Sequence, residues 1–333
     1  MWPLSGQEPN NKESHHSSCE SACVGSPFAV NLEAMKVLAS IASILLILCG
    51  LASAQRARQT APVASARTIT IVTEPQTIVW IDEIRRGVTN DSGTLGSLKL
   101  SAGTHTARVR AMDFKEVSMP ISAGQRGEVR VPLVRTTDQA ELVFQKAENA
   151  RESARDEPSR QGAVDLYRQA LKLRPAYPSA HVGLARVLLD LNDTNGALAE
   201  IEAARGARAV YPEASAVEGR IYRETGQTDE AIGAFNRAIR EARGFQPEAH
   251  VGIGRVYEDK GEYELAAREF KIAIDQLFDT EPIIYQMLGG AYEKTGKNQE
   301  AIAAYENYLR LAPNGSQATA VRSIVEQLKS PQP

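Results

Sequence analysis

Cysteine is almost absent from this chain. The 333 residues include three, Cys19, Cys23 and Cys49, and all lie within the first 50 residues, ahead of every segment that we expect to fold. A thiol nucleophile or a cysteine metal ligand is therefore excluded from the folded part. This usage fits an oxidising compartment, although a cytosolic protein can lack cysteine too.

A strong excess of charge of either sign is also lacking. The formal net charge is -3, which provides no electrostatic basis for binding a polyanion, so we predict no nucleic-acid partner. Nowhere does the sequence combine a nucleophile, a base and an orienting group, or show a metal-binding motif. We therefore predict a protein that is not an enzyme and needs no cofactor.

Long apolar runs are limited to one segment near the start. Residues 35–54 combine a basic start, an apolar stretch from Val37 to Leu48, and small residues at Ala52 and Ala54. This is the layout of a secretory signal peptide. We predict cleavage after Ala54 and export to the periplasm or the cell surface.

Two alternatives to cleavage stay open. The uncharged run 37–54 is near the lower length limit for spanning a bilayer, so it would serve as a single N-terminal anchor in the inner membrane. Membrane contact is expected only if this segment is retained. A lipidated Cys49 is the other alternative, and the bulky Leu48 before it argues against that modification.

The segments on either side of the signal have no sustained apolar face. Residues 1–34 are polar and aperiodic, so we interpret them as a non-native or disordered extension, with translation starting at Met35. Residues 55–67, rich in Ala, Arg, Gln and Pro, are predicted to be a flexible linker.

Short strand-like runs occupy residues 68–135. Runs such as Ile78 to Ile81 and Val129 to Val134 are β-branched or aromatic, and turn residues such as Ala102-Gly103 separate them. Helical periodicity is absent. This pattern predicts a small all-β domain, a compact antiparallel sandwich of about five to seven strands.

The motif order within this segment identifies a family resemblance. A turn at Pro75 leads into Val79-Trp80-Ile81-Asp82, and Gly87-Val88-Thr89 and Gly103-Thr104-His105 follow. This order resembles the PEGA family, from which the chain departs by placing Glu83 where the family has glycine. The resemblance implies a surface-associated or wall-associated binding module.

Two side chains of this domain invite a functional interpretation. His105 would suit catalysis, but no cysteine, metal-ligand cluster or acid partner at a telling spacing accompanies it, so we expect it to fix a turn. Trp80 would suit sugar stacking, but its place between Val79 and Ile81 in a strand favours simple packing.

A repeat of about 34 residues is the strongest pattern in the chain. Small residues recur at spacings of 34, 34, 35 and 35, at Ala163, Ala197, Ala231, Ala266 and Ala301. Four positions after each comes a bulky residue: Tyr167, Ile201, Phe235, Phe270 or Tyr305. Such spacing marks one face of a helix that occurs five times.

A second helix precedes each of these, and together they resemble a known repeat. Prolines open the units at Pro178, Pro212, Pro247 and Pro282, where a missing N–H costs little. The pattern resembles the tetratricopeptide repeat, a helix-turn-helix of 34 residues. The resemblance implies a superhelical solenoid of about five repeats over residues 140–313, and we predict a capping helix within 314–330. The first unit is irregular, with Arg151 at a small-residue position.

A column of charged residues lies on the first helices of three successive units. It comprises Arg186, Arg220 and Arg255, each followed four residues later by Asp190, Glu224 or Asp259. The resemblance implies that these helices line a concave groove for partner proteins. Stacked arginines there would hold carboxylates of a partner, whereas pairing of each arginine with its own acid would leave the stripe neutralised, and we favour the second interpretation.

These features favour a non-enzymatic exported scaffold that binds other proteins or extended peptide segments through the groove, with the β domain as a second docking module. The alternative is a cell-wall or glycan-binding protein in which the β domain carries the function and the repeats are a spacer. The sequence does not identify the partner or the oligomeric state.

Overall fold

The computed structural model describes residues 67–101, 103–278 and 280–330. All of them belong to one compact unit, Ala64–Pro333. The predicted extension, the signal peptide and nearly all of the linker lie outside the described residues. Within the described part, no helix has both the length and the apolar character needed to cross a bilayer.

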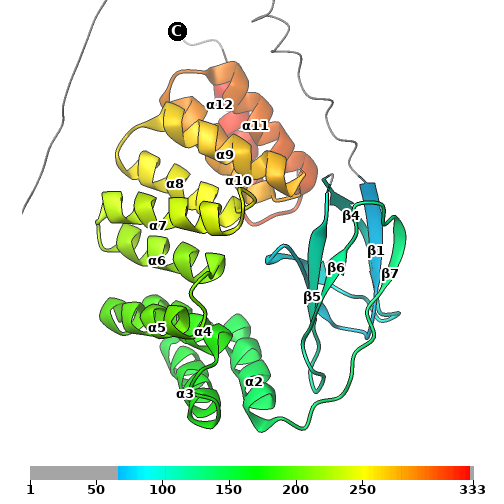
Figure 1. The fold of residues 1–333 in the computed structure, drawn as a ribbon. Helices are drawn as coiled ribbons and strands as arrows, with labels where there is room; N and C mark the ends of the chain where they lie inside the picture. Colours follow the sequence, from blue (N-terminus) through cyan, green and yellow to red (C-terminus); the bar gives the residue numbers. More distant parts are fainter. Residues whose placement is uncertain (1–66, 102, 279, 331–333) are drawn as a thin grey trace, which may run out of the picture. The chain divides into compact units, whose positions relative to one another are not determined.

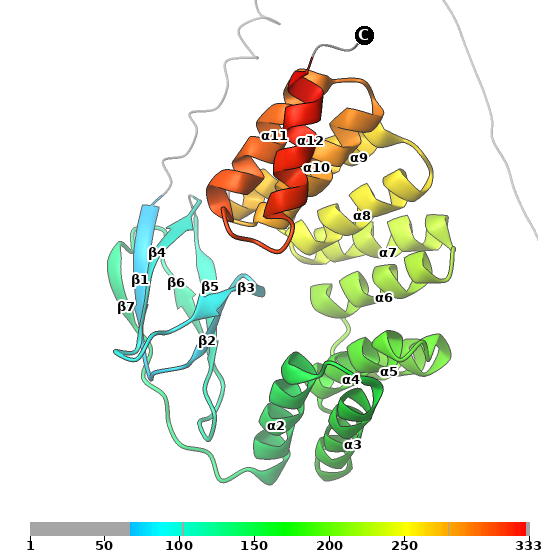
Figure 2. The ribbon, with the colours of Figure 1, turned by 180° about the vertical axis from the view of Figure 1, so that it is seen from behind.

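Seven strands of the described chain form the small β domain. They are β1 (Arg67–Val72), β2 (Ile78–Ile81), β3 (Ile84–Val88), β4 (Thr94–Leu100), β5 (His105–Arg110), β6 (Val117–Ile121) and β7 (Gly127–Arg130). They make two sheets, in the orders β4-β1-β7 and β3-β2-β5-β6 (Figures 1 and 2). The predicted all-β fold is confirmed. The expectation of purely antiparallel pairing is wrong in one place, because β1 and β7 run parallel.

The core of this domain follows the alternation of each strand. Ile69 and Ile71 of β1 and Val79 and Ile81 of β2 are buried, and they join one apolar cluster with residues of β4, β5 and β6. Successive side chains of a strand point to opposite faces, so each sheet presents an apolar face to this cluster.

The tight turn between β2 and β3 places two ordinary residues in the left-handed region. Asp82 has φ 51° and Glu83 has φ 66°, as a two-residue hairpin loop of type I′ requires. Asp82 anchors this turn, because its carboxylate lies 2.5 Å from His105 Nδ1 and accepts from the Thr106 N–H at 2.8 Å. His105 therefore has an acidic partner that its sequence position did not indicate.

His105 is held on its other side by Ser101. Nε2 lies 3.2 Å from the Ser101 carbonyl oxygen and 3.4 Å from the Ser101 hydroxyl oxygen. The contacts of His105 therefore join the β2–β3 turn to the segment between β4 and β5.

The rest of the described chain is helical. It comprises α2 (Gln139–Ser153), α3 (Glu157–Leu173), α4 (Pro178–Asp190), α5 (Thr194–Ala207), α6 (Pro212–Glu224), α7 (Thr228–Glu241), α8 (Pro247–Asp259), α9 (Tyr263–Leu277), α10 (Pro282–Lys294), α11 (Asn298–Leu311) and α12 (Ala318–Lys329). Helices α2 to α11 form five consecutive hairpins, and α12 packs beside α11 (Figure 2). The predicted solenoid of five repeats with a capping helix is confirmed.

Local sequence explains where these helices begin. The four predicted prolines occupy the first turn of α4, α6, α8 and α10. A helix leaves its first N–H groups without internal partners, so proline is tolerated there. In the later units the turn between the two helices uses Gly226, Gly261 and Gly296, all with positive φ.

The repeats interlock through rings that fill the space left by glycines. A methyl group added at Gly219 or Gly252 would come within 2.7 or 2.3 Å of the Phe235 ring. Gly219 belongs to the same hairpin as Phe235, and Gly252 to the next. This arrangement confirms that the bulky residues fill the gap between units, so each repeat depends on its neighbours for its core.

Candidate functional site

Helix α2 is fixed to the loop between β5 and β6 by two buried side chains. The Gln145 amide accepts a hydrogen bond from the Asp113 N–H at 2.9 Å and donates one to the Phe114 carbonyl at 2.8 Å. Glu141 accepts from the Glu116 N–H at 2.7 Å. The first helix of the array therefore satisfies three backbone groups of the β domain.

Arg110 of β5 extends this contact. Arg110 is only 6% exposed; it donates to Glu116 at 2.6 Å and to Glu148 of α2 at 3.2 Å. Its guanidinium also lies 4.6 Å from the centre of the Phe144 ring. A buried arginine needs such partners, because an unpaired charge away from water is strongly disfavoured.

The β2–β3 hairpin contributes the next contacts. Arg85 donates to both carboxylate oxygens of Glu152, at 3.1 and 3.3 Å. Ile84 packs against the apolar cluster built by α9, α10, α11 and α12. The hairpin therefore reaches both early and late repeats of the array.

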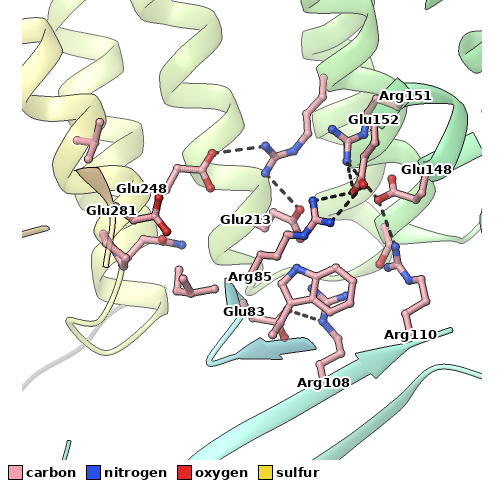
Figure 3. Close-up of a pocket in the computed structure, with 18 of the residues that line it drawn as sticks. Glu83, Arg85, Arg108, Arg110, Glu148, Arg151, Glu152, Glu213, Glu248 and Glu281 are labelled. Carbon is pink, nitrogen blue, oxygen red and sulfur yellow. Dashed lines mark hydrogen bonds and ion pairs between the residues drawn. The ribbon is translucent and has the colours of Figure 1, made fainter. Parts of the chain in front are cut away.

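These elements enclose a pocket of about 410 Å³ between the β domain and the first helices of the repeats (Figure 3). Its cations are Arg85, Arg108, Arg110, Arg151 and Arg186. Its carboxylates are Glu83, Glu148, Glu152, Glu213, Glu248 and Glu281. A cavity of this size is in the range of natural ligand pockets, about 300 to 1,000 Å³.

Near α2 the charges neutralise one another. Burial opposes ionisation of Glu148, but Arg110 and Arg151 outweigh burial and hold the pKa of this carboxyl below its ordinary value. The Tyr167 hydroxyl also donates to Glu148 and accepts from Arg151 Nε at 3.2 Å. Arg151 stands at a position where the repeat has a small residue, and its side chain lines the pocket.

On the opposite side of the pocket, the carboxylates have fewer cationic partners. Figure 3 shows Glu248 and Glu281 together, away from Arg110 and Glu148. Glu248 accepts from Arg186 at 3.5 Å, the outer limit of a hydrogen bond. Burial raises the pKa of Glu281, and the charge of Arg86 opposes this effect.

The six residues predicted for the groove do not behave as one column. Arg186 lines the pocket, and its guanidinium donates to Glu213 at 3.2 Å instead of pairing with Asp190. Arg220 donates to Glu224 at 2.8 Å, as expected for a pair within one helix turn, and also to Asp190 at 2.8 Å.

The third pair of the column, Arg255 and Asp259, does not line the pocket. Arg255 is exposed, and Asp259 accepts from Arg223 at 2.7 Å. Of the six predicted residues, Arg186 alone lines this pocket. The sequence interpretation missed the residues that the β domain and α2 contribute, although Arg151 and Glu83 stood out as departures from the repeat and from the PEGA pattern.

Comparison with known families identifies the helical part. Models described as "Tetratricopeptide repeat" match residues 156–221, 216–282 and 252–316. The helical array is built from tetratricopeptide repeats. No PEGA model matches the β domain, and a search of the curated proteins finds no match to the chain.

Two solved structures illustrate the similarity of the helical part to known proteins. A thermophilic protein of Thermus thermophilus is 24% identical, covers 57% of this chain and 98% of its own, and has a TM-score of 0.48. PilF of Pseudomonas aeruginosa is 14% identical, with coverage of 57% and 90% and a TM-score of 0.47. Because identities and TM-scores are this low, neither structure transfers a function.

The comparisons find no catalytic family, and the part of the chain that the structure describes holds no candidate metal cluster. No enzyme family matches the chain. Among residues 67–101, 103–278 and 280–330, no group of three or more His, Cys, Asp or Glu side chains is placed to hold a metal ion. Tetratricopeptide repeats are typically non-catalytic and bind proteins or peptides.

Proposed function

We propose that this protein is a non-enzymatic exported scaffold that binds extended segments of partner proteins in the concave surface of its repeats. The observation that supports this role is the pocket itself. Its helical wall consists mainly of first helices of successive hairpins, which supply Phe144, Gly183, Glu213, Val251 and Ile283. A surface made by several repeats suits a ligand longer than one residue.

The β domain completes the binding surface in this proposal. It is a PEGA-like module whose hairpin and β5 supply one wall of the pocket, so it acts as a second docking point beside the repeats. The strained turn supports this role: Glu83, at φ 66°, accepts from Arg108 Nε at 2.8 Å. A glycine would relieve the backbone but would remove this contact.

The alternative role as a glycan-binding protein receives less support. Trp80 would be its stacking platform, but the Arg108 guanidinium lies 4.0 Å from the centre of its ring. Arg110 lies 5.0 Å from the same centre. The ring is therefore already engaged by cations of its own sheet, which favours the scaffold over the wall-binding module.

Site-specific photocrosslinking tests the scaffold role. A benzoylphenylalanine at Ile283, which is half-exposed and lines the pocket, should capture a partner from an envelope extract of the native host. The same group at Ile272, an exposed position of α9 that does not line the pocket, is the matched control. Equal capture at both positions, or capture at Ile272 alone, would contradict binding in the groove.

Export is the second part of the proposal and has its own test. The signal-peptide layout of residues 35–54 places the mature N-terminus at Gln55. Mass spectrometry of the protein recovered from its native host should therefore find Gln55 as the first residue. Peptides from residues 1–34 would contradict a translation start at Met35, and an intact 37–54 segment would favour the membrane anchor.

A further inference from the structure

We propose that the end of the pocket formed by Gln246, Glu248 and Glu281 binds a basic side chain of the partner, with an aliphatic residue of the same segment on the adjacent apolar wall. This inference rests on the proposed scaffold function and deepens it by naming the chemistry of the bound segment. Its sign is opposite to that of an arginine clamp for acidic partners.

The distribution of charge favours a cation. Each of the five arginines of the pocket has at least one carboxylate partner, for instance Arg108 with Glu83 and Arg186 with Glu213. Glu281, by contrast, is attracted by Arg86 but has no direct ion pair among the described residues, and it does not cap α10 although it stands directly before that helix. The lining of the pocket therefore holds six carboxylates against five arginines, and Glu281 is the carboxylate with the least direct neutralisation.

Gln246 provides independent evidence that a hydrogen-bond donor of the ligand belongs at this end of the pocket. This residue is 3% exposed and lines the pocket, yet its Oε1 has no hydrogen-bond partner among the described residues. A buried acceptor without a partner is costly, and few remain in folded proteins. An ammonium or guanidinium group carries several donors, so one such group can serve Gln246 and a carboxylate together.

The adjacent wall is apolar and partly uncovered. Val251, Leu277, Ile283 and Ile284 line this part of the pocket, and Ile283 is 50% exposed. An aliphatic side chain placed there would remove apolar surface from water on both partners. Arginine and lysine stems can also lie along such a surface while the charged group contacts the carboxylates.

The chain's own hairpin displays the same chemistry at this site. Ile84 packs against the apolar cluster of the late repeats, and Arg86, two residues on, is attracted by Glu281. An aliphatic residue and a nearby arginine are therefore already accommodated here. A partner segment with the same pattern would add a second such pair in the remaining space.

A labelled peptide tests the assignment with the full chain. The probe is a fluorescein-labelled heptapeptide, Gly-Ser-Ile-Arg-Arg-Ser-Gly, and its control replaces both arginines by glutamine. We expect the arginine probe to bind at least about tenfold more tightly in fluorescence polarisation, since one charge-assisted contact to a carboxylate is worth about this factor. We also expect Glu248→Gln combined with Glu281→Gln to remove most of this preference.

The matched control is Glu264→Gln, which removes one exposed carboxylate of α9 outside the pocket and should leave binding unchanged. Equal affinity for both probes, absence of binding, or tighter binding of a version with two glutamates would each overturn the proposal. If the Ile283 crosslinker still captures a partner in that case, the scaffold role stands and only the basic-segment assignment fails.

Discussion

Gly252 shows how closely successive repeats approach. A methyl group at this position would lie 2.3 Å from Cζ of Phe235, a buried ring that is already held between two helices. We therefore expect Gly252→Ala to lower the free energy of unfolding by about 1 to 3 kcal/mol, through overpacking. Urea denaturation followed by circular dichroism measures this change.

Gly233 of α7 is the matched control for that prediction. It is also helical, but an added methyl group would meet no atom within 4 Å. Gly233→Ala should therefore raise the free energy of unfolding by about 0.5 to 1 kcal/mol, because alanine loses less conformational freedom. Equal effects of the two substitutions would mean that helix propensity, not ring packing, governs these positions.

His181 gives the stability of the array a defined pH dependence. Nδ1 lies 2.6 Å from Glu200 Oε2 and Nε2 lies 2.8 Å from the Pro175 carbonyl oxygen, so both nitrogens face acceptors. The hydrogen bond to Glu200 raises the pKa of His181 above its ordinary value, and burial opposes this effect less strongly. The protonated ring is therefore favoured by folding.

The sign of the effect follows from this direction. A raised pKa stabilises the folded state below the unfolded value of about 6.5, and the contribution is lost as pH rises through the folded pKa. The stability difference between wild type and His181→Gln should be fully present below about pH 6.5 and should shrink as the pH rises above that value. Glu200→Gln should weaken the same dependence; a pH-independent difference in both variants would contradict the assignment.

At the scale of elements, one amide side chain makes two of the hydrogen bonds that attach α2 to the β domain. Gln145 is 2% exposed and satisfies both the Asp113 N–H and the Phe114 carbonyl. Gln145→Ala would leave these groups without partners and should cost about 1 to 3 kcal/mol. Hydrogen exchange at the Asp113 amide should accelerate. Gln161→Ala, at an exposed position of α3, should change neither property.

The elements that could be predicted from sequence are those with local signals. The recurrence of Ala231 and Phe235 on one helix face, and a proline such as Pro212 at a helix start, identify hairpins without knowledge of the partner chain segments. The parallel pairing of β1 with β7 could not be predicted in this way. Its register joins Ile69 to Gly127, residues far apart in sequence, and turn chemistry does not fix such a pairing.

At the scale of the whole described unit, the pocket joins residues that no sequence period relates. Arg85 and Glu152 are 67 positions apart, and Arg85 lies in strand β3 whereas Glu152 lies in helix α2. Two departures from the expected patterns were the local signals of this site. Glu83 stands where the PEGA family has a turn glycine, and Arg151 stands where the repeat has a small residue. Both side chains line the pocket, as is expected when function overrides local preference.

The central claim is that the β domain is held against the concave surface of the repeats, so that both contribute to one site. The most direct test uses double electron–electron resonance on the full chain, with Cys19, Cys23 and Cys49 replaced by serine. Spin labels at Lys99 of β4 and Lys271 of α9, both exposed, report the distance between the two parts. Labels at Lys172 of α3 and Lys271 provide the width expected within the array. We predict that the first distance distribution is as narrow as the second; a distribution several times broader, as tethered domains would produce, would contradict the account.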